Sequence, residues 1–323
     1  MLVSYHASHE QFDPAELLTL AVRAEQAGFD AIFSSDHLQP WAPKQGESGH
    51  AWAWLGAAMQ ATRRCPFGVI TVPSGWRYQP VVLAQAIATL GLMFPHRLPW
   101  VAFGSGEAIN ECAVGADWPH KDERNARLKE GAAIVRALLA GAKVTHRGRV
   151  QAVNAKLWSR PAEPAQIIGA ATTEQTAAWL ATWADGLLTT CHDLKQLKRI
   201  VQAFRDAGGT GRPVHVKVDI SWALTDERAL LQAHEQWRYN MLGTGSNWDI
   251  SDPSHFERAA RFIRPEDVRE AVFVSADLDE HAARLREIGE LGVATIDVHN
   301  VGHNQAEFID AFGRHVLAQL THP

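Results

Sequence analysis

The amino-acid sequence predicts a single (β/α)₈ TIM barrel that covers residues 1–323 and carries insertion segments. Three observations support this α/β fold. Eight short β-like runs alternate with amphipathic helical stretches, as parallel strands joined by crossover helices require. Hydrophobic residues make up 46% of the chain, enough for a large core. No linker rich in Gly, Ser or Pro divides the chain into two domains.

The first βα unit has the clearest boundaries. Its strand is expected over Leu2–Tyr5. Asp13 precedes the helix, Pro14 occupies its first position, and Glu16 follows the cap by three residues in a capping-box arrangement. The helix is expected to end at Gly28. The alternative fold is a doubly wound open sheet, which usually has a glycine-rich turn after its first strand, where this chain reads HASHEQF.

The remaining elements follow in order along the chain. The further expected strands are Ala31–Ser34, Phe67–Val72, Leu98–Phe103, Gln166–Gly169, Gly186–Thr190, Val214–Ala223 and Thr295–His299. Helical patterns lie between them, for example over Arg124–Ala140 and Thr173–Trp183.

Two segments are longer than the connections that a minimal barrel requires. Val144–Val153 predicts a hairpin around Arg147-Gly148. Met241–Phe256 is polar and glycine-rich, and it predicts a long loop or lid near the seventh unit. Long loops in a compact domain are more often functional than not.

Composition excludes several classes of function. The net charge is -5 with both signs interspersed, which argues against nucleic acid or an anionic membrane as a partner. The longest stretch without Lys, Arg, Asp or Glu is Tyr78–His96, whose prolines and glutamines predict a buried helix and not a membrane span. The cysteines Cys65, Cys112 and Cys191 are far apart, and the N-terminus lacks the features of a signal peptide. A cytoplasmic location is expected.

Candidate catalytic residues follow the predicted strands, where barrel enzymes keep their chemistry. In Asp36-His37, a carboxylate beside an imidazole can orient a general base, although adjacent strand residues point to opposite sides. The alternative is a histidine that holds a loop. Glu107 lies in the turn GSGEAIN, where Gly106 lets the backbone approach a ligand and the carboxylate can exchange a proton. The alternative for Glu107 is a helix-start carboxylate stabilised by the helix dipole.

Other features of the predicted barrel mouth have both functional and structural interpretations. Trp41 follows Pro40 in a loop, where a core role is less natural. Thr172 and Thr173 begin a helix after the fifth strand, and they either bind a phosphate or cap the helix. Four histidines could meet as the metal ligands of a barrel hydrolase, although single histidines are more often structural. They are His6, His9, His299 and His303.

Several motifs together resemble one known superfamily. They are, in chain order, ASHEQF, SSDHLQPW, WRYQP, GSGEAINE and VHNVGHNQAEFIDAF. Through them the chain resembles the luciferase-like flavin and deazaflavin oxidoreductases, and within these the branch of coenzyme F420-dependent glucose-6-phosphate dehydrogenases. The likeness runs from near residue 6 to near residue 315. The chain is also similar to a sub-branch that is expected to use an ordinary flavin.

The resemblance implies roles for individual residues. His37 matches a general base that takes the proton from a substrate hydroxyl, and Glu107 matches a proton donor beside the reactive ring. Trp41 matches an aromatic residue that packs beside the ring or stabilises the intermediate, and Glu10 matches an acid after the first strand. The cofactor-binding positions implied are Asp36, Ile70, Thr71, Gly106, Asn110, Ala171 and Thr172. At Ile70-Thr71 the family has a non-prolyl cis peptide.

Departures from the family pattern concern the substrate and the cofactor. The sugar-phosphate dehydrogenases that the chain resembles hold the phosphate with two lysines and an arginine, and the resemblance matches these to Asp193, Asn247 and Ala271 here. Lys195 could take one of the three roles, but without the full set a phosphate would lose charge-assisted hydrogen bonds, so glucose 6-phosphate is not expected as the substrate. Ala171-Thr172 replaces a Gly-Gly pair at the cofactor phosphate, which narrows the path of a long deazaflavin tail. FMN is therefore the expected cofactor, with coenzyme F420 as the alternative.

These features predict a flavin-type oxidoreductase that transfers hydride between its cofactor and an alcohol or a non-phosphorylated sugar. A reduced-flavin monooxygenase is the alternative within the class. A metal-dependent barrel hydrolase and a flavin-binding protein without turnover are alternatives from other classes. The resemblance also implies a homodimer, and the uncharged stretches Ala51–Ala61 and Tyr78–Met93 could face the partner.

Overall fold

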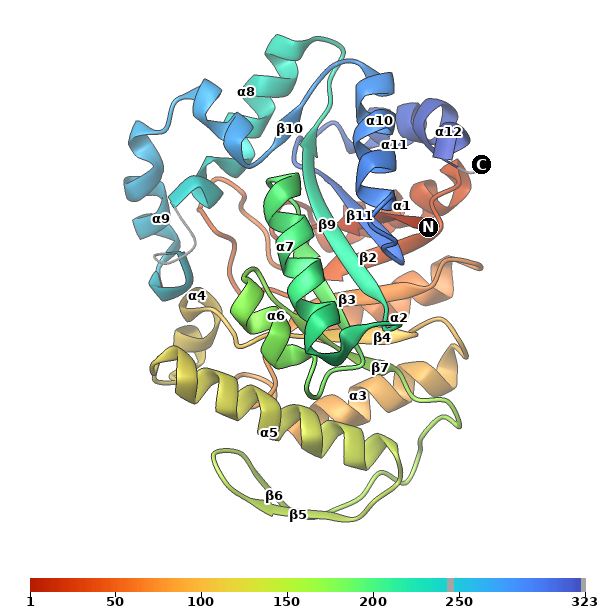
Figure 1. The fold of residues 1–323 in the computed structure, drawn as a ribbon, viewed down its shortest axis with the longest axis vertical. Coiled ribbons are helices and arrows are strands. Elements are labelled where there is room, and N and C mark those ends of the chain that lie inside the picture. The colour runs from red at the N-terminus through yellow and green to blue at the C-terminus, as the bar shows by residue number, and fades with distance from the viewer. Residues whose placement is uncertain (243–246, 321–323) are drawn as a thin grey trace.

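The computed structural model describes residues 1–242 and 247–320, and these form a closed barrel of parallel strands (Figure 1). The strand order is β9-β11-β1-β2-β3-β4-β7-β8, and a further pairing of β8 with β9 closes the sheet. The barrel strands are β1 (Leu2–Ala7), β2 (Ala31–Ser35), β3 (Phe67–Val72), β4 (Trp100–Phe103), β7 (Gln166–Ala170), β8 (Gly186–Thr190), β9 (Val214–Ser221) and β11 (Thr295–Asn300). The predicted (β/α)₈ fold is confirmed.

All eight expected strands are present, with small differences at their ends. β4 begins at Trp100 and not at Leu98, because the intervening Pro99 has no N–H to donate to a neighbouring strand. The sheet has a further short strand in the described part of the chain, β10 (Phe273–Val274), which pairs in parallel with the C-terminal end of β9. Its two residues are too few to leave a periodic signal in the sequence.

Helices surround the barrel. In the described part of the chain they are α1 (Pro14–Ala27), α2 (Ala51–Ala61), α3 (Pro80–Met93), α4 (Ala108–Glu111), α5 (Lys121–Leu139), α6 (Glu174–Leu180), α7 (Leu194–Phe204), α8 (Asp226–Trp237), α9 (Pro253–Ala259), α10 (Leu278–Gly289), α11 (Gln305–Ala311) and α12 (Ala318–Leu320). Asp13 caps α1 by accepting hydrogen bonds from the N–H groups of Ala15 and Glu16, and Gly28 ends it with a φ of 101°. Among the described residues, no helix combines the length and apolarity that a membrane span needs.

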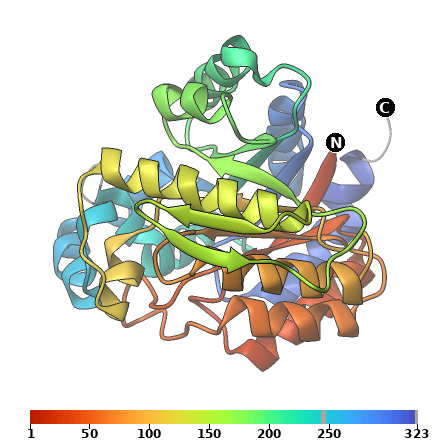
Figure 2. The same cartoon turned by 90° about the horizontal axis from the view of Figure 1, so that it is seen from below.

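The hairpin expected after α5 is present. β5 (Val144–Arg147) and β6 (Gln151–Ala155) pair antiparallel, and Figure 2 shows them alongside α5. Glu130 of α5 fastens the hairpin, because its carboxylate accepts hydrogen bonds from the side chain of Arg149 and the backbone N–H of Val150.

The expected long loop over Met241–Phe256 is partly helical. A 3₁₀ turn covers Asn247–Asp249, and α9 begins at Pro253. Asp252 caps α9 by accepting from the N–H of Ser254. Residues 243–246 of this predicted lid lie outside the described part of the chain.

The barrel interior has an apolar side and a polar side. The apolar side is a cluster of Ala31, Phe33, Ile70, Trp100, Ala102, Ile168 and Leu188. The polar side lies on β1, β9 and β11, where His6 pairs with Asp297 at 2.7 Å and His299 pairs with Asp219 at 3.0 Å. The imidazoles contact the two buried aspartates and Lys217 also pairs with Asp219, so these carboxylates do not carry the desolvation cost of isolated ions.

Candidate active site

Three candidate catalytic side chains meet at the C-terminal ends of the strands. Glu10 follows β1, His37 follows β2, and Glu107 follows β4. His37 Nε2 lies 3.4 Å from Glu10 Oε1 and 3.7 Å from Glu107 Oε2. The side chains are 12%, 5% and 16% exposed for His37, Glu10 and Glu107, so the imidazole edge stands between two largely buried carboxylates.

Two serine hydroxyls hold the Glu10 carboxylate. Ser8 Oγ and Ser35 Oγ donate to Glu10 Oε2 at 2.9 and 2.8 Å. Burial acts to raise the pKa of Glu10, but the neighbouring His37 and the hydrogen bond from Ser35 outweigh it, and the pKa falls to about 2. Glu10 is therefore a fixed anion whose other oxygen faces His37.

Glu107 faces the same imidazole without such support. It is the N-cap residue of α4, but its side chain makes no capping hydrogen bond, so capping does not account for its position. Its Oε2 is buried and has no hydrogen-bond partner among the described residues. Burial raises the pKa of Glu107, the charge of Glu10 adds to the rise, and His37 and Arg77 oppose it. A carboxyl group in this environment is suited to proton exchange.

Asn110 contacts the opposite edge of the imidazole. Its Nδ2 lies 3.2 Å from His37 Nδ1. Its Oδ1 accepts from the backbone N–H groups of Leu38 at 2.8 Å and Gln39 at 3.2 Å. Asn110 was expected at the cofactor ring, and sequence spacing gave no sign of its contact with His37.

Trp41 lies in an aromatic and aliphatic cluster beside His37. Its ring centroid is 5.3 Å from that of His37 and 5.3 Å from that of Phe256. The buried members of the cluster are Trp41, Ala42, Ile109, Tyr239, Phe256 and Ala260. Trp248 of the 3₁₀ turn packs against it, with its ring centroid 6.4 Å from that of Trp41. One wall of the site is therefore apolar.

Asp36 belongs to a separate ionic network next to the site. Its Oδ1 accepts from Tyr78 Oη at 2.8 Å and from Arg77 Nη1 at 3.2 Å. Arg77 Nε lies 3.3 Å from Glu111 Oε1, and burial raises the pKa of Glu111 to about 7. Sequence reasoning assigned no role to Arg77, Tyr78 and Glu111, although each lies in a segment that follows a strand end.

Several features of the mouth fit a flat ring with hydrogen-bonding edges. The Ile70–Thr71 peptide bond is cis, as the family resemblance implied. A Cβ at Gly104 would lie 3.0 Å from Thr71 Oγ1, closer than most side-chain contacts, so glycine favours this close approach of the loop to β3. Gly106 has a φ of +83°, a conformation that glycine adopts readily. Asp36 Oδ2 is a buried acceptor without a donor among the described residues, and an N–H of a flavin-type ring would supply one.

The segment expected at the cofactor phosphate begins α6. The N–H of Ala171 donates to Leu188 O at 2.9 Å, and Ala171 is buried. Thr173 is the N-cap residue and accepts from the N–H of Thr176, so Thr172 is not required for capping. The role of Ala171 and Thr172 in cofactor binding stays a prediction.

The positions that correspond to the sugar-phosphate cations lie after β8 and near β10. Asp193 caps α7 by accepting from the N–H groups of Lys195 and Gln196, and these bonds lower its pKa. His192 Nδ1 lies 3.1 Å from Ala271 O, which places the two segments side by side. The side chain of Asn247 lies outside the described part of the chain. An acid and an alanine thus stand in this region.

The four histidines considered as metal ligands do not form one cluster. The rings of His6 and His299 lie 4.3 Å apart, and each is paired with a different aspartate. The ring of His9 packs on Trp54, and that of His303 packs on Phe12. Within residues 1–242 and 247–320, no three His, Cys, Asp or Glu side chains stand in an arrangement suited to a metal ion.

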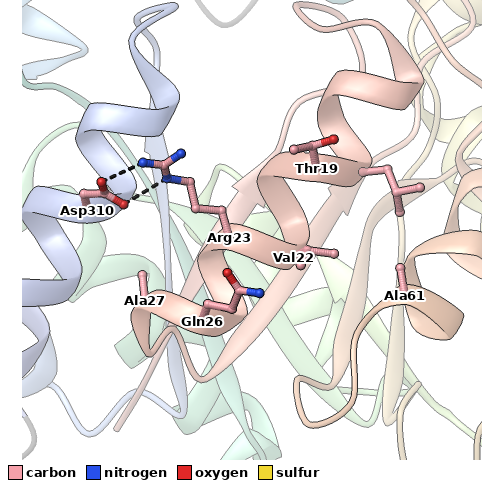
Figure 3. Close-up of a pocket in the computed structure, with 8 residues that line it drawn as sticks. Thr19, Val22, Arg23, Gln26, Ala27, Ala61 and Asp310 are labelled. Atoms are coloured by element: carbon pink, nitrogen blue, oxygen red, sulfur yellow. Dashed lines mark hydrogen bonds and ion pairs between the residues drawn. The ribbon is translucent and has the colours of Figure 1, made fainter.

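An open groove on the outer helices is unrelated to this site. It has a volume of about 670 Å³ and is lined by residues of α1, the end of α2 and α11 (Figure 3). The exposed Arg23–Asp310 pair, with N–O distances of 2.9 and 2.7 Å, lies at one edge. None of the candidate catalytic residues lines this groove.

Residues 2–295 match the model of the Luciferase-like monooxygenase family. The chain belongs to this family and is an oxidoreductase, which confirms the superfamily inferred from its motifs.

Similar proteins place the chain within the family. It is 34% identical over 324 residues to the F420-dependent glucose-6-phosphate dehydrogenase of Microbacterium testaceum (strain StLB037), covering 98% of this chain and 96% of that protein. A solved F420-dependent secondary alcohol dehydrogenase in complex with an F420-acetone adduct is similar with a TM-score of 0.89 and 27% identity, each chain being 98% covered. A type II Baeyer-Villiger monooxygenase from Pseudomonas putida in complex with FMN shares the fold, with a TM-score of 0.73, 16% identity and full coverage of both chains.

Proposed function

We propose that this protein interconverts a neutral alcohol and its carbonyl counterpart, using a coenzyme F420-type deazaflavin. The observation that carries this proposal is the placement of His37 Nε2 between two carboxylates, 3.4 Å from Glu10 and 3.7 Å from Glu107, next to the aromatic wall of Trp41. Such a site can bind a hydroxyl group, move its proton and hold an apolar substrate body.

The cofactor proposed here is the alternative of the two that the sequence suggested. The names of the relatives that resemble this chain at 34% and 27% identity specify F420, and these are the more similar proteins, whereas the FMN-bound neighbour shares only the fold. Residues proposed to hold the cofactor are Asp36, Ile70, Thr71, Gly106, Asn110, Ala171 and Thr172. When bound, it would supply the hydride acceptor or donor.

The chain's own residues would bind and orient the substrate and manage its proton. His37 and Glu107 would contact the substrate oxygen, and Glu10 would hold the imidazole in place through its fixed charge. Trp41, which is 8% exposed, would pack against the apolar part of the substrate or the ring. Burial of this site strengthens each electrostatic contact by removing water.

We propose a substrate without a phosphate group. The family resemblance matches Asp193, the N-cap of α7, to a phosphate-binding cation of the sugar-phosphate dehydrogenases, and its carboxylate would repel a phosphate dianion. The buried residues around Trp41 are apolar or aromatic, which favours a small secondary alcohol over a sugar phosphate. A non-phosphorylated sugar is the second substrate class to assay.

Parallel fluorescence titrations of the apo-protein with coenzyme F420 and with FMN test the cofactor. We expect tight binding of F420, followed by its reduction when a secondary alcohol is added but not when glucose 6-phosphate is added. Tight binding of FMN alone would overturn the deazaflavin proposal and favour the reduced-flavin monooxygenase. Binding of neither would overturn both. The His37→Ala variant is the matched control, since it should retain cofactor binding and lose turnover.

We further propose that residues 1–323 act as one domain in a cytoplasmic homodimer. Exposed apolar side chains on α3 support a partner surface there: Val82, Leu92 and Met93. Light scattering should give twice the chain mass of 35.6 kDa. A mass equal to one chain would overturn the dimer.

A further inference from the structure

We infer that Asn110 is a positioning residue that fixes the tautomer of His37, with the hydrogen on Nε2 and a bare acceptor at Nδ1. The inference follows from the orientation of the Asn110 amide. Its Oδ1 lies 2.8 Å from the N–H of Leu38 and 3.2 Å from the N–H of Gln39. Both partners are donors only, so the atom between them must be the amide oxygen.

The Asn110 NH₂ group is then directed at His37. Nδ2 lies 3.2 Å from His37 Nδ1, and because an NH₂ group only donates, Nδ1 must accept. A flipped amide would place its NH₂ against two backbone donors and would leave all three groups without acceptors.

The surroundings hold Asn110 in this orientation. The residue is 3% exposed and lies in α4. The side-chain amide of Gln39 donates to Ile109 O at 2.6 Å, which ties the loop after β2 to the same helix. The two backbone donors therefore cannot move away independently of Asn110.

The consequence concerns which group takes the substrate proton, and here the inference rests on the proposed alcohol chemistry. With its hydrogen on Nε2, His37 can only donate towards the substrate. Its expected role as general base would need a bare Nε2 and an N–H at Nδ1, which would face the Asn110 NH₂, donor against donor. The hydrogen-bond pattern favours Glu107 as the base.

The geometry allows one substrate oxygen to contact both groups. His37 Nε2 and Glu107 Oε2 are 3.7 Å apart, so an oxygen about 2.8 Å from each completes a triangle with them. In the oxidation direction, the substrate O–H bond breaks and its proton passes to Glu107 Oε2. The C–H bond breaks with its electron pair leaving as hydride for the bound deazaflavin-type acceptor, and the C=O bond forms. His37 keeps its proton and donates a hydrogen bond to the oxygen throughout.

Nitrogen NMR of the histidine side chains in the apo-protein tests the inference without cofactor or substrate. The His37→Gln variant identifies the His37 signals by their loss. We expect wild-type His37 at neutral pH to carry hydrogen on Nε2 and none on Nδ1. A proton on Nδ1 in the wild type would overturn the inference, whatever the variants do.

The Asn110→Asp variant reverses the hydrogen bond. One carboxylate oxygen would still accept from Leu38 and Gln39, and the other would accept at His37 Nδ1, so Nδ1 should gain a proton. We expect single-turnover hydride transfer to fall by about 10² to 10⁴, the usual range for misplaced acid–base groups. The matched control is Asn154→Asp on the β5–β6 hairpin, which makes the same amide-to-carboxylate change at a position away from the site.

The outcomes separate this inference from the proposed function. If Asn110→Asp leaves the tautomer of His37 unchanged, Asn110 does not position it and the inference fails. If the tautomer is as expected but the protein binds neither cofactor, only the proposed function fails. A loss of turnover in Asn110→Asp with an unchanged NMR tautomer would count against the inference, because it would assign Asn110 to cofactor binding alone.

Discussion

Two segments of the site each place a carboxylate near Nε2 of His37, and the two carboxylates differ in their proton affinity. We call the segment after β1, with Glu10, the β1 arm, and the segment after β4, with Glu107, the β4 arm. The β1 arm carries Glu10, whose carboxylate is bonded to Ser8 and Ser35 and has a pKa of about 2. The β4 arm carries Glu107, whose facing oxygen has no hydrogen-bond partner within residues 1–242 and 247–320 and whose pKa is raised by burial. Both carboxylates are largely buried, so the difference comes from the groups around them: His37 and the Ser35 hydroxyl lower the pKa of Glu10, and the charge of Glu10 raises the pKa of Glu107.

The difference shows how two glutamates in one site can have different proton affinities. Two hydroxyl donors stabilise the charged form of Glu10, so it stays ionised through the working pH range. Glu107 lacks such donors and stands next to another anion, so its neutral form is favoured. Pairs of groups with separated proton affinities are typical of acid–base sites.

Removing the titratable carboxyl group of Glu107 should have the largest effect on the reaction rate. We expect Glu107→Gln to reduce the rate of hydride transfer by about 10² to 10⁴ while cofactor binding is retained. Because the ionised carboxylate is the active form in alcohol oxidation, the wild-type rate should rise as pH passes the raised pKa of Glu107. The variant should lose this rise, as measured by single-turnover kinetics across pH.

A nearby charge serves as the control for Glu107→Gln. Glu111→Gln removes a carboxylate at the end of the same short helix, where it contacts Arg77 and not His37. Because this ion pair is buried, the variant should lose stability, but we expect a smaller rate loss than for Glu107→Gln and a retained rise of the rate with pH. Equal effects of the two substitutions would mean that the lost charge alone is responsible, and Glu107 would then not be the base.

The β1 arm should contribute mainly to stability. The pKa of Glu10 is about 2 against an ordinary value of 4.5, which corresponds to about 3 kcal/mol of unfolding free energy at neutral pH. Because the folded pKa is the lower one, this stabilisation is present above about pH 4.5 and is lost as pH falls towards 2. Glu10→Gln should remove most of it and flatten this acid limb in chemical denaturation.

Glu25→Gln separates stability from activity. Glu25 accepts backbone hydrogen bonds from Arg63, Arg64 and Cys65, and these lower its pKa against burial at a place away from the site. We expect this variant to lose stability at neutral pH and to flatten the acid limb while keeping its turnover, whereas Glu10→Gln should lose part of both stability and turnover. An unchanged acid limb in Glu10→Gln would show that Glu10 titrates alike in the folded and unfolded chain.

The sequence predicted the barrel better than it predicted contacts within the site. Apolar runs revealed the eight strands because each must bury a continuous face. The adjacent Asp36 and His37 were considered together, yet the structure places Asp36 with Arg77 and Tyr78 and places His37 with Glu10, Glu107 and Asn110. Neighbours on a strand point to opposite sides, so their real partners come from other strands.

The orientation of Asn110 shows why the remaining contacts could not be predicted. Its hydrogen bonds to Leu38 and Gln39 depend on how α4 meets the loop after β2, more than seventy residues earlier in the chain. No local sequence period or spacing predicts a contact between two segments so far apart in the chain. The family resemblance assigned the residue to the cofactor ring, which is compatible with a second contact at His37.

The smallest effect in the comparison should come from one donor of the β1 arm. Ser35→Ala removes the 2.8 Å hydrogen bond to Glu10 and leaves that from Ser8, so the pKa of Glu10 should rise but stay below its ordinary value. We expect a stability loss of about 1 kcal/mol, measured by chemical denaturation, and a rate loss of less than about tenfold. Ser48→Ala is the control, because Ser48 Oγ donates to the backbone carbonyl of His37. If both variants shifted the NMR titration of Glu10 equally, the hydroxyl donors would not be the cause of its low pKa, and the contrast between the two arms would have to arise from the nearby imidazoles and the backbone.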